Sequence, residues 1–210
     1  MSTPSSPAKT SRAAKTSRAE SQAATRERLI ETAERLIVTE SIPALSLRRL
    51  CAEAGFTQGA FYSNFASKEA LLLEVMERHL DKQYQRLAAV ERQAAGSDPD
   101  TVFAAVANWL GEHGQRREWA ALSAELRLQA FRDPEFGKQL NAADRRITAK
   151  FASLIDEMGA EIGMKPVIPS HTLAETMFGI WYSIMLREPE KIAPEKLFVT
   201  VLRRMMERRG

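Results

Sequence analysis

Apolar residues recur every three to four positions along almost the whole chain, which is the period of an amphipathic helix rather than of a strand. The alternating pattern and the Asn-Gly or Asp-Gly pairs that mark β-hairpins do not occur in the sequence. In the first clear segment, residues 25–39, the apolar positions fall on one helical stripe: Leu29, Ile30, Ala33, Leu36 and Ile37. The pattern therefore predicts an all-α protein.

Caps, glycines and prolines divide this pattern into about nine helices. Side chains that can accept hydrogen bonds from the first amides of a helix stand at Ser46, Thr57, Ser67, Asp98 and Asp133. Proline follows both aspartates, at the first helical position, where its missing amide costs nothing. The expected helices cover residues 25–39, 47–54, 57–64, 68–90, 99–113, 117–131, 134–162, 170–187 and 194–208.

Composition separates three regions of the chain. Residues 1–22 are rich in Ser, Thr, Ala and Lys and have no apolar run that could pack, so we expect a mobile basic arm. Two helical regions are expected to follow, over residues 23–83 and 84–210, with a break of composition at 96–99. Residues 1–90 hold 13 Lys and Arg against 10 Asp and Glu, whereas the rest holds 17 of each. Only residues 1–90 therefore carry an excess of positive charge, which favours binding to a polyanion.

Several classes of protein are excluded by what the sequence lacks. The one cysteine, Cys51, allows no internal disulfide and no multi-cysteine zinc site, and it falls on the inward stripe of its helix. The histidines His79, His113 and His171 lie on different helices without a partner at metal or catalytic spacing. No nucleophile with a paired base, no phosphate loop and no apolar run of roughly 18 residues occurs. We expect a cytoplasmic protein that is not an enzyme and has no metal, cofactor or membrane segment.

The two helices around Gly55 have the lengths and connection of a helix-turn-helix, over about residues 45–64. In such a motif the first helix packs inward and the second lies in the major groove of DNA. Phe61 and Phe65 stand four residues apart and can pack inward together. The remaining outer surface is small and polar, as close approach to the bases requires: Thr57, Gln58, Gly59, Ala60, Tyr62 and Ser63.

Individual side chains on this surface suit different parts of a duplex. Gln58 can pair with a base edge, and Ala60 can touch a thymine methyl group. The Tyr62 hydroxyl and Lys68, at the start of the next helix, suit phosphates. The expected DNA-binding set is completed by Ser46, Arg48 and Asn64.

One stretch of the chain resembles the DNA-binding signature of the tetracycline-repressor (TetR) family. It is the run from Leu47 to Leu71, LRRLCAEAGFTQGAFYSNFASKEAL. The shared features, in fixed order, are a Gly turn, a Gly-x-aromatic-Tyr segment, and an aromatic residue followed by Ser-Lys-Glu-x-Leu. With the preceding helix, the resemblance covers about residues 23–83. It implies a recognition helix over residues 57–64, a phosphate-binding Tyr62, and a Lys68 that anchors the backbone at the next helix.

The resemblance also implies a divergent carboxy-terminal domain, which holds a ligand, and a dimer interface made by the last two long helices. The residues agree with this, because apolar positions over 173–185 surround more of the helix than one core can cover, and a second stripe follows at 197–205. A four-helix seam between two subunits would bury both. The expected interface residues are Phe178, Ile184, Met185, Leu197, Phe198, Val201, Leu202 and Met205.

The large side chains of the second domain are either plain core or the lining of a ligand pocket, and the sequence leaves both open. The candidate ligand-binding residues are Phe103, Trp109, His113, Trp119, Phe151, Met177 and Trp181. We interpret the protein as a homodimer with a three-helix DNA-binding domain and a larger helical domain. Its expected function is that of a repressor, released from double-stranded operator DNA by a small apolar or amphipathic ligand. A constitutive DNA-binding protein without an effector and a transcriptional activator are the alternatives.

Overall fold

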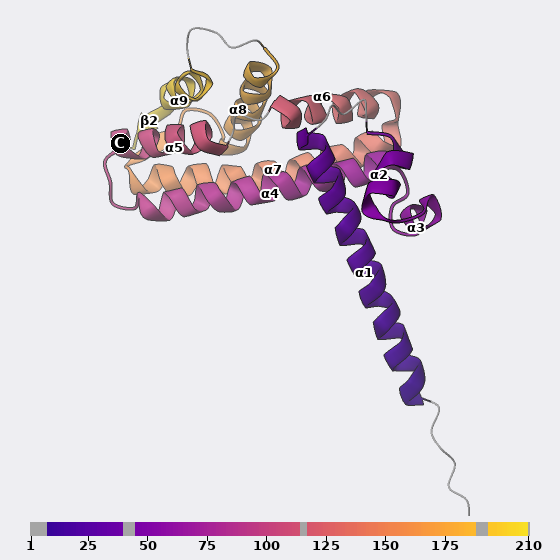
Figure 1. Ribbon diagram of the computed structural model, residues 1–210. Coiled ribbons are helices and arrows are strands. Elements are labelled where there is room, and N and C mark those ends of the chain that lie inside the picture. Colours follow the sequence, from indigo (N-terminus) through magenta and orange to yellow (C-terminus); the bar gives the residue numbers. More distant parts are fainter. Residues whose placement is uncertain (1–7, 40–44, 114–116, 188–192, 210) are drawn as a thin grey trace, which may run out of the picture. The chain divides into compact units, whose positions relative to one another are not determined.

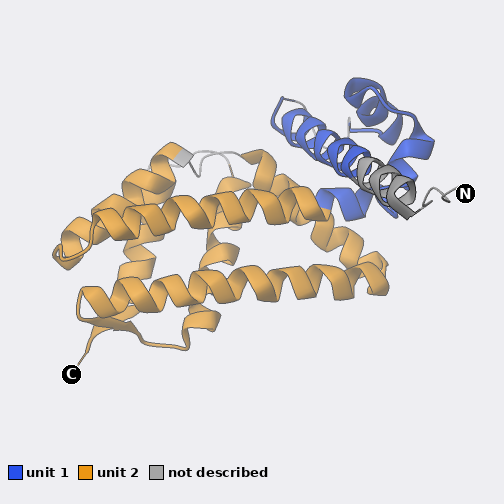
Figure 2. Cartoon of the chain, turned by 90° about the horizontal axis from the view of Figure 1, so that it is seen from below, with its two compact units in different colours: residues 1–72 blue, residues 73–210 orange. Residues whose placement is uncertain are grey.

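The computed structural model describes residues 8–39, 45–113, 117–187 and 193–209, and within them the side chains of all but residues 8–19 and 113. The chain forms two compact units, residues 1–72 and 73–210, which Figure 2 shows in different colours. The division falls inside one helix, α4 (Lys68–Gln93). The described residues hold nine helices and two three-residue strands, so the prediction of an all-α fold is confirmed except for these strands.

The first unit contains α1 (Ala8–Thr39), α2 (Leu47–Ala54), α3 (Gln58–Tyr62) and the start of α4. α1 begins at Ala8, so the prediction that the first helix starts at about residue 25 is wrong, and residues 8–22 of the expected mobile arm are helical. The physical reason is local propensity, since no Gly or Pro occurs within α1 and its first half is rich in Ala, Lys and Arg. A segment without an apolar stripe can still be helical when it continues a packed helix.

The core of the first unit is built where α1 meets α2 and α3. The predicted stripe of α1 is confirmed, because all five of its side chains are buried: Leu29, Ile30, Ala33, Leu36 and Ile37. Leu50, Cys51 and Ala54 of α2 and Phe61 of α3 are buried as well. Burial raises the pKa of the Cys51 thiol, so the side chain acts as a small apolar residue.

Three of the predicted caps are seen in the first unit. The hydroxyl oxygens of Ser46, Thr57 and Ser67 accept hydrogen bonds from backbone amides three residues further on, at 3.2, 3.2 and 3.1 Å. Gly55 ends α2 with φ +77°, a left-handed conformation that any other residue would adopt at a cost. These local interactions set the short turn between α2 and α3.

The second unit contains the rest of α4 with α5 (Pro99–His113), α6 (Arg117–Arg132), α7 (Pro134–Glu161), α8 (Ser170–Met185) and α9 (Pro194–Arg204), which Figure 1 labels. Asp98 and Asp133 accept from the first amides of α5 and α7, as predicted. α4 and α7 lie side by side, joined by a Tyr84–Phe151 ring contact of 5.7 Å and by ion pairs of Asp81 with Lys150 and of Glu77 with Arg146.

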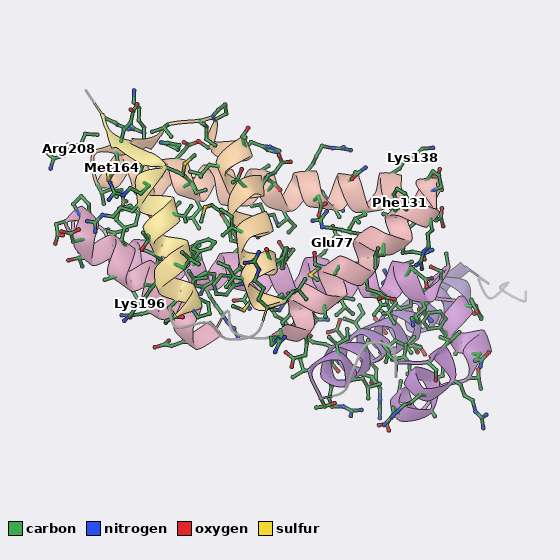
Figure 3. The ribbon with its side chains drawn as sticks, turned by 90° about the horizontal axis from the view of Figure 1, so that it is seen from above. Glu77, Phe131, Lys138, Met164, Lys196 and Arg208 are labelled. Carbon is green, nitrogen blue, oxygen red and sulfur yellow. The ribbon has the colours of Figure 1, made fainter. Side chains whose placement is uncertain are left out.

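The carboxy-terminal end differs from the prediction. The sequence predicts a last helix that reaches residue 208, but α9 ends at Arg204 and β2 (Met206–Arg208) pairs antiparallel with β1 (Met164–Pro166). Figure 3 labels Met164 and Arg208, which are partners in this pair. Gly159 lets β1 pass over α7, since a Cβ there would stand 2.9 Å from the Met164 carbonyl oxygen. Pairing with a distant segment overrides the helical pattern.

Candidate DNA-binding surface and ligand cavity

The helix-turn-helix presents the outer side of α3. Phe61 and Phe65 are buried with their ring centroids 5.6 Å apart, so they fix the inner side of the short helix, as the sequence predicts. Tyr62 is 59% exposed although it is a large aromatic residue, and Ala60 is half-buried. The outer surface is polar and almost free of charge, and its exposed residues are Thr57, Gln58, Gly59, Tyr62 and Ser63.

Two residues of α1 that were not predicted as part of the site hold the end of α3. Arg26 donates to the Asn64 carbonyl oxygen at 2.7 Å, and its guanidinium lies 4.2 Å from the centre of the Phe65 ring. Gln22 donates to the Ser63 carbonyl oxygen at 3.1 Å. Arg26 stands three residues before Leu29, on the buried side of the same helix, and this spacing is the signal that could have found it.

The candidate DNA-contacting residues are not all equally available. The Asn64 side chain turns back on α3, where its amide nitrogen donates to the Ala60 carbonyl oxygen at 2.8 Å. The Lys68 ammonium donates to the Leu45 carbonyl oxygen at 3.0 Å, which joins the start of α4 to the segment before α2. An ammonium has three hydrogens, so this bond leaves Lys68 able to donate elsewhere. Ser46 and Arg48 are both exposed.

The second unit contains an apolar cavity of about 150 Å³. Side chains from α4 to α9 line it, and none of them is Asp, Glu, Lys or Arg. The structure brings six of the seven candidate ligand-binding residues together on its wall: Phe103, Trp109, Trp119, Phe151, Met177 and Trp181. The side chain of the seventh, His113, lies outside the described residues.

Aromatic rings form much of the cavity wall. The His79 ring stacks on Trp119, with centroids 3.7 Å apart and an angle of 10° between the planes. Phe151 meets Phe178 edge to face at 4.9 Å, and Trp181 meets Phe198 in the same way at 5.5 Å. The polar residues His79, Gln83 and Tyr182 of the wall were not predicted, because a helical pattern shows which side is buried but not where a cavity lies.

A second cavity, of about 420 Å³, adjoins the first and is more polar. Its wall includes Ser123, Arg127 and Asp144, and the last two form an ion pair at 2.9 Å. Tyr182 lines both cavities. Burial raises the pKa of Tyr182 to about 12, so its hydroxyl stays neutral while it interacts with Ser123.

The structure divides the residues predicted for a dimer interface into two groups. One group faces the apolar cavity of its own chain: Phe178, Met185, Phe198 and Leu202. The other group does not line that cavity: Ile184, Leu197, Val201 and Met205. Within the single chain Met185 is buried, and the other seven are half-buried.

The described parts of the chain contain neither a metal-binding cluster nor a membrane-spanning helix. No three His, Cys, Asp or Glu side chains within these ranges gather closely enough to hold a metal ion. Among the described helices, none is both long and apolar enough to span a membrane.

Comparison with known proteins gives a family match in the helix-turn-helix region. Residues 29–75 match the family model described as "Bacterial regulatory proteins, tetR family". The chain is 35% identical over 78 residues to the uncharacterized HTH-type transcriptional regulator YerO of Bacillus subtilis (strain 168), which is 37% of this chain and 27% of YerO. It is 34% identical over 80 residues to the HTH-type transcriptional repressor NemR of Escherichia coli (strain K12), which is 38% of this chain and 40% of NemR. These matches span less than half of either relative.

Solved structures match over most of the chain. The reduced form of Escherichia coli NemR superimposes with a TM-score of 0.63 at 20% identity, over 89% of this chain and 99% of that one. The multidrug binding protein EbrR complexed with imidazole gives a TM-score of 0.59 at 21% identity, over 87% of this chain and 94% of that one. At these identities the likeness shows that the fold is shared.

Proposed function

Because the chain belongs to the TetR family of bacterial regulatory proteins, we propose that it is a DNA-binding transcriptional repressor that a small ligand releases from its operator. The observation that carries this proposal is α3. Its inner side is fixed by the buried Phe61 and Phe65, while Gln58 and Tyr62 stand exposed on its outer side. A short helix that is held rigidly and is free of acidic side chains can enter a major groove.

The apolar cavity supports the second part of the proposal. A cavity of this kind in a helical domain is the usual place for a small molecule. One helix, α4, carries Lys68 and also the cavity residues His79 and Gln83. A ligand that shifts α4 would therefore change the position of the DNA-binding residues. Such coupling typically amounts to about 1–3 kcal/mol, or roughly 5- to 150-fold in DNA affinity.

The protein acts as a homodimer in this proposal, because twofold operators need two recognition helices. Leu197 and Val201 of α9, with Ile184 of α8, form the seam with the second subunit. They are apolar and lie outside the cavity lining, and none of the three is fully buried in the single chain. The protein would act in the cytoplasm, where operator DNA is found.

Lys68 provides the test of the DNA-binding surface. Lys68→Gln removes the charge but keeps an amide donor that can serve the Leu45 carbonyl oxygen, so the fold is preserved. We expect weaker binding to every DNA sequence and a slope of log affinity against log salt that is smaller by about 0.9 for each phosphate that Lys68 no longer neutralises. The measurement is a salt titration by fluorescence anisotropy on specific and scrambled duplexes.

The matched control is Lys138→Gln, since Lys138 is an exposed lysine of α7 in the other unit. The control should leave the slope at its wild-type value. An unchanged slope for Lys68→Gln would show that the phosphate-binding surface lies elsewhere.

A further inference from the structure

Gln83 brings a polar atom without a partner to the apolar cavity. The side-chain amide oxygen of Gln83, Oε1, is buried and accepts no hydrogen bond from any described residue. Gln83 lies on α4, one turn after His79, and its side chain is part of the cavity wall. Buried acceptors are nearly always paired in folded proteins, so an unpaired one calls for a physical explanation.

The surroundings of Gln83 restrict what could pair with it. The side chains from the facing helices, such as Phe103 and Val106 of α5 and Leu202 of α9, are apolar. No Asp or Glu side chain of the described residues lines the cavity, so a cationic donor would lose its hydration without meeting an opposite charge. The group that pairs with Gln83 is therefore a neutral donor on an otherwise apolar molecule.

The volume and the rings of the cavity restrict the ligand further. An apolar cavity of about 150 Å³ accommodates one aromatic ring such as benzene. Flat faces are present on the same wall, since the rings of His79 and Trp119 are nearly parallel. A planar molecule can lie against them with its donor toward Gln83, whose terminal torsion is broad enough to turn the oxygen toward it.

We propose that the cavity binds a small neutral aromatic molecule with one hydroxyl or amine donor, a phenol or an aryl amine, and that Gln83 Oε1 accepts its hydrogen bond. This inference rests on the proposed ligand-release function and names the class of ligand. Pairing the buried oxygen removes the cost of leaving it unsatisfied, so the donor adds affinity that the ring alone does not supply.

The test compares phenol with toluene, which has the same ring and nearly the same shape but no donor. Both are titrated calorimetrically into the full-length protein and into Gln83→Met, whose side chain is unbranched and of similar length. We expect the ratio of phenol to toluene affinity to fall by about 3- to 10-fold in the variant. Use of the ratio cancels the difference in hydration between the two probes. Trp109, Trp119 and Trp181 all line the cavity and are the only tryptophans of the chain, so their emission reports its occupancy.

Arg86→Met is the matched control, because Arg86 is on the same helix but is exposed. It should leave the affinity ratio unchanged, and Gln83→Leu should repeat the effect of Gln83→Met if that variant does not fold. The proposal is overturned if the ratio is the same in wild type and in the Gln83 variants, or if phenol does not bind.

DNA affinity, measured in the same samples, separates this inference from the proposed function. Phenol that binds through Gln83 without weakening DNA binding would support the ligand class and contradict ligand release. Release of DNA by phenol and toluene alike, with no dependence on Gln83, would support ligand release and contradict the ligand class.

Discussion

Phe61→Ala is expected to abolish DNA binding. The Phe61 side chain is fully buried, and its ring contacts both Phe65 and Tyr62. Removing a buried phenylalanine side chain typically costs about 3–5 kcal/mol, because the ring no longer packs against its neighbours and a cavity remains. Small domains are stable by only about 5–15 kcal/mol, so the loss is a large fraction of the stability that holds α3 in place, and α3 no longer presents a fixed surface to DNA.

The measurement is thermal unfolding by circular dichroism together with DNA binding by anisotropy. Phe131→Ala serves as the control, since Phe131 of α6 is 89% exposed and its truncation removes little packing. The control should melt and bind as the wild type does. A Phe61→Ala protein with wild-type melting temperature and DNA affinity would show that α3 is held in another way.

Leu197→Glu combined with Val201→Glu is expected to give monomers that bind DNA poorly. These residues stand one turn apart on α9, so the substitutions place two negative charges in the proposed seam. Two linked recognition helices bind more tightly than one, because the second contact is made at high effective concentration. Loss of the dimer should therefore weaken specific binding by about 100- to 10,000-fold.

Sedimentation and anisotropy measurements check this result. A matched pair, Ala149→Glu with Ser153→Glu, puts the same charges at the same spacing on exposed positions of α7. This pair should remain dimeric and keep its affinity. Persistence of dimers in the α9 variant would place the interface on another surface of the second unit.

Local interactions explain why much of the DNA-binding surface was predictable. The caps at Ser46 and Thr57 and the left-handed Gly55 act over three or four residues, and each can be recognised from the residues themselves. The buried pair Phe61 and Phe65 follows from helical spacing alone. The contribution of Arg26 involves a residue 38 positions away, and only the spacing to Leu29 hints at it.

The second unit was less predictable because an apolar stripe does not reveal what covers it. The sequence places Phe178 and Met185 on the same apolar helix as Ile184, yet the first two face the cavity and the third does not line it. Gln83 looks like an ordinary surface residue in the sequence, although its amide oxygen is buried. The β1–β2 pair depends on chain segments about 40 residues apart, beyond the reach of helical periodicity.

Selection of bound sequences from random DNA tests most directly whether α3 of a twofold dimer recognises operator DNA. The full-length protein should enrich inverted repeats whose half-sites lie about 34–36 Å apart, or a multiple of that distance. Gln58→Ala should relax the choice at one base pair in each half-site, at a cost of about 1–3 kcal/mol on the favoured pair. Arg86→Ala, an exposed change in the other unit, should select the wild-type sequence. Absence of enrichment, a single unpaired tract bound by a monomer, or an unchanged preference in Gln58→Ala would show that α3 is not the reading helix of a dimer.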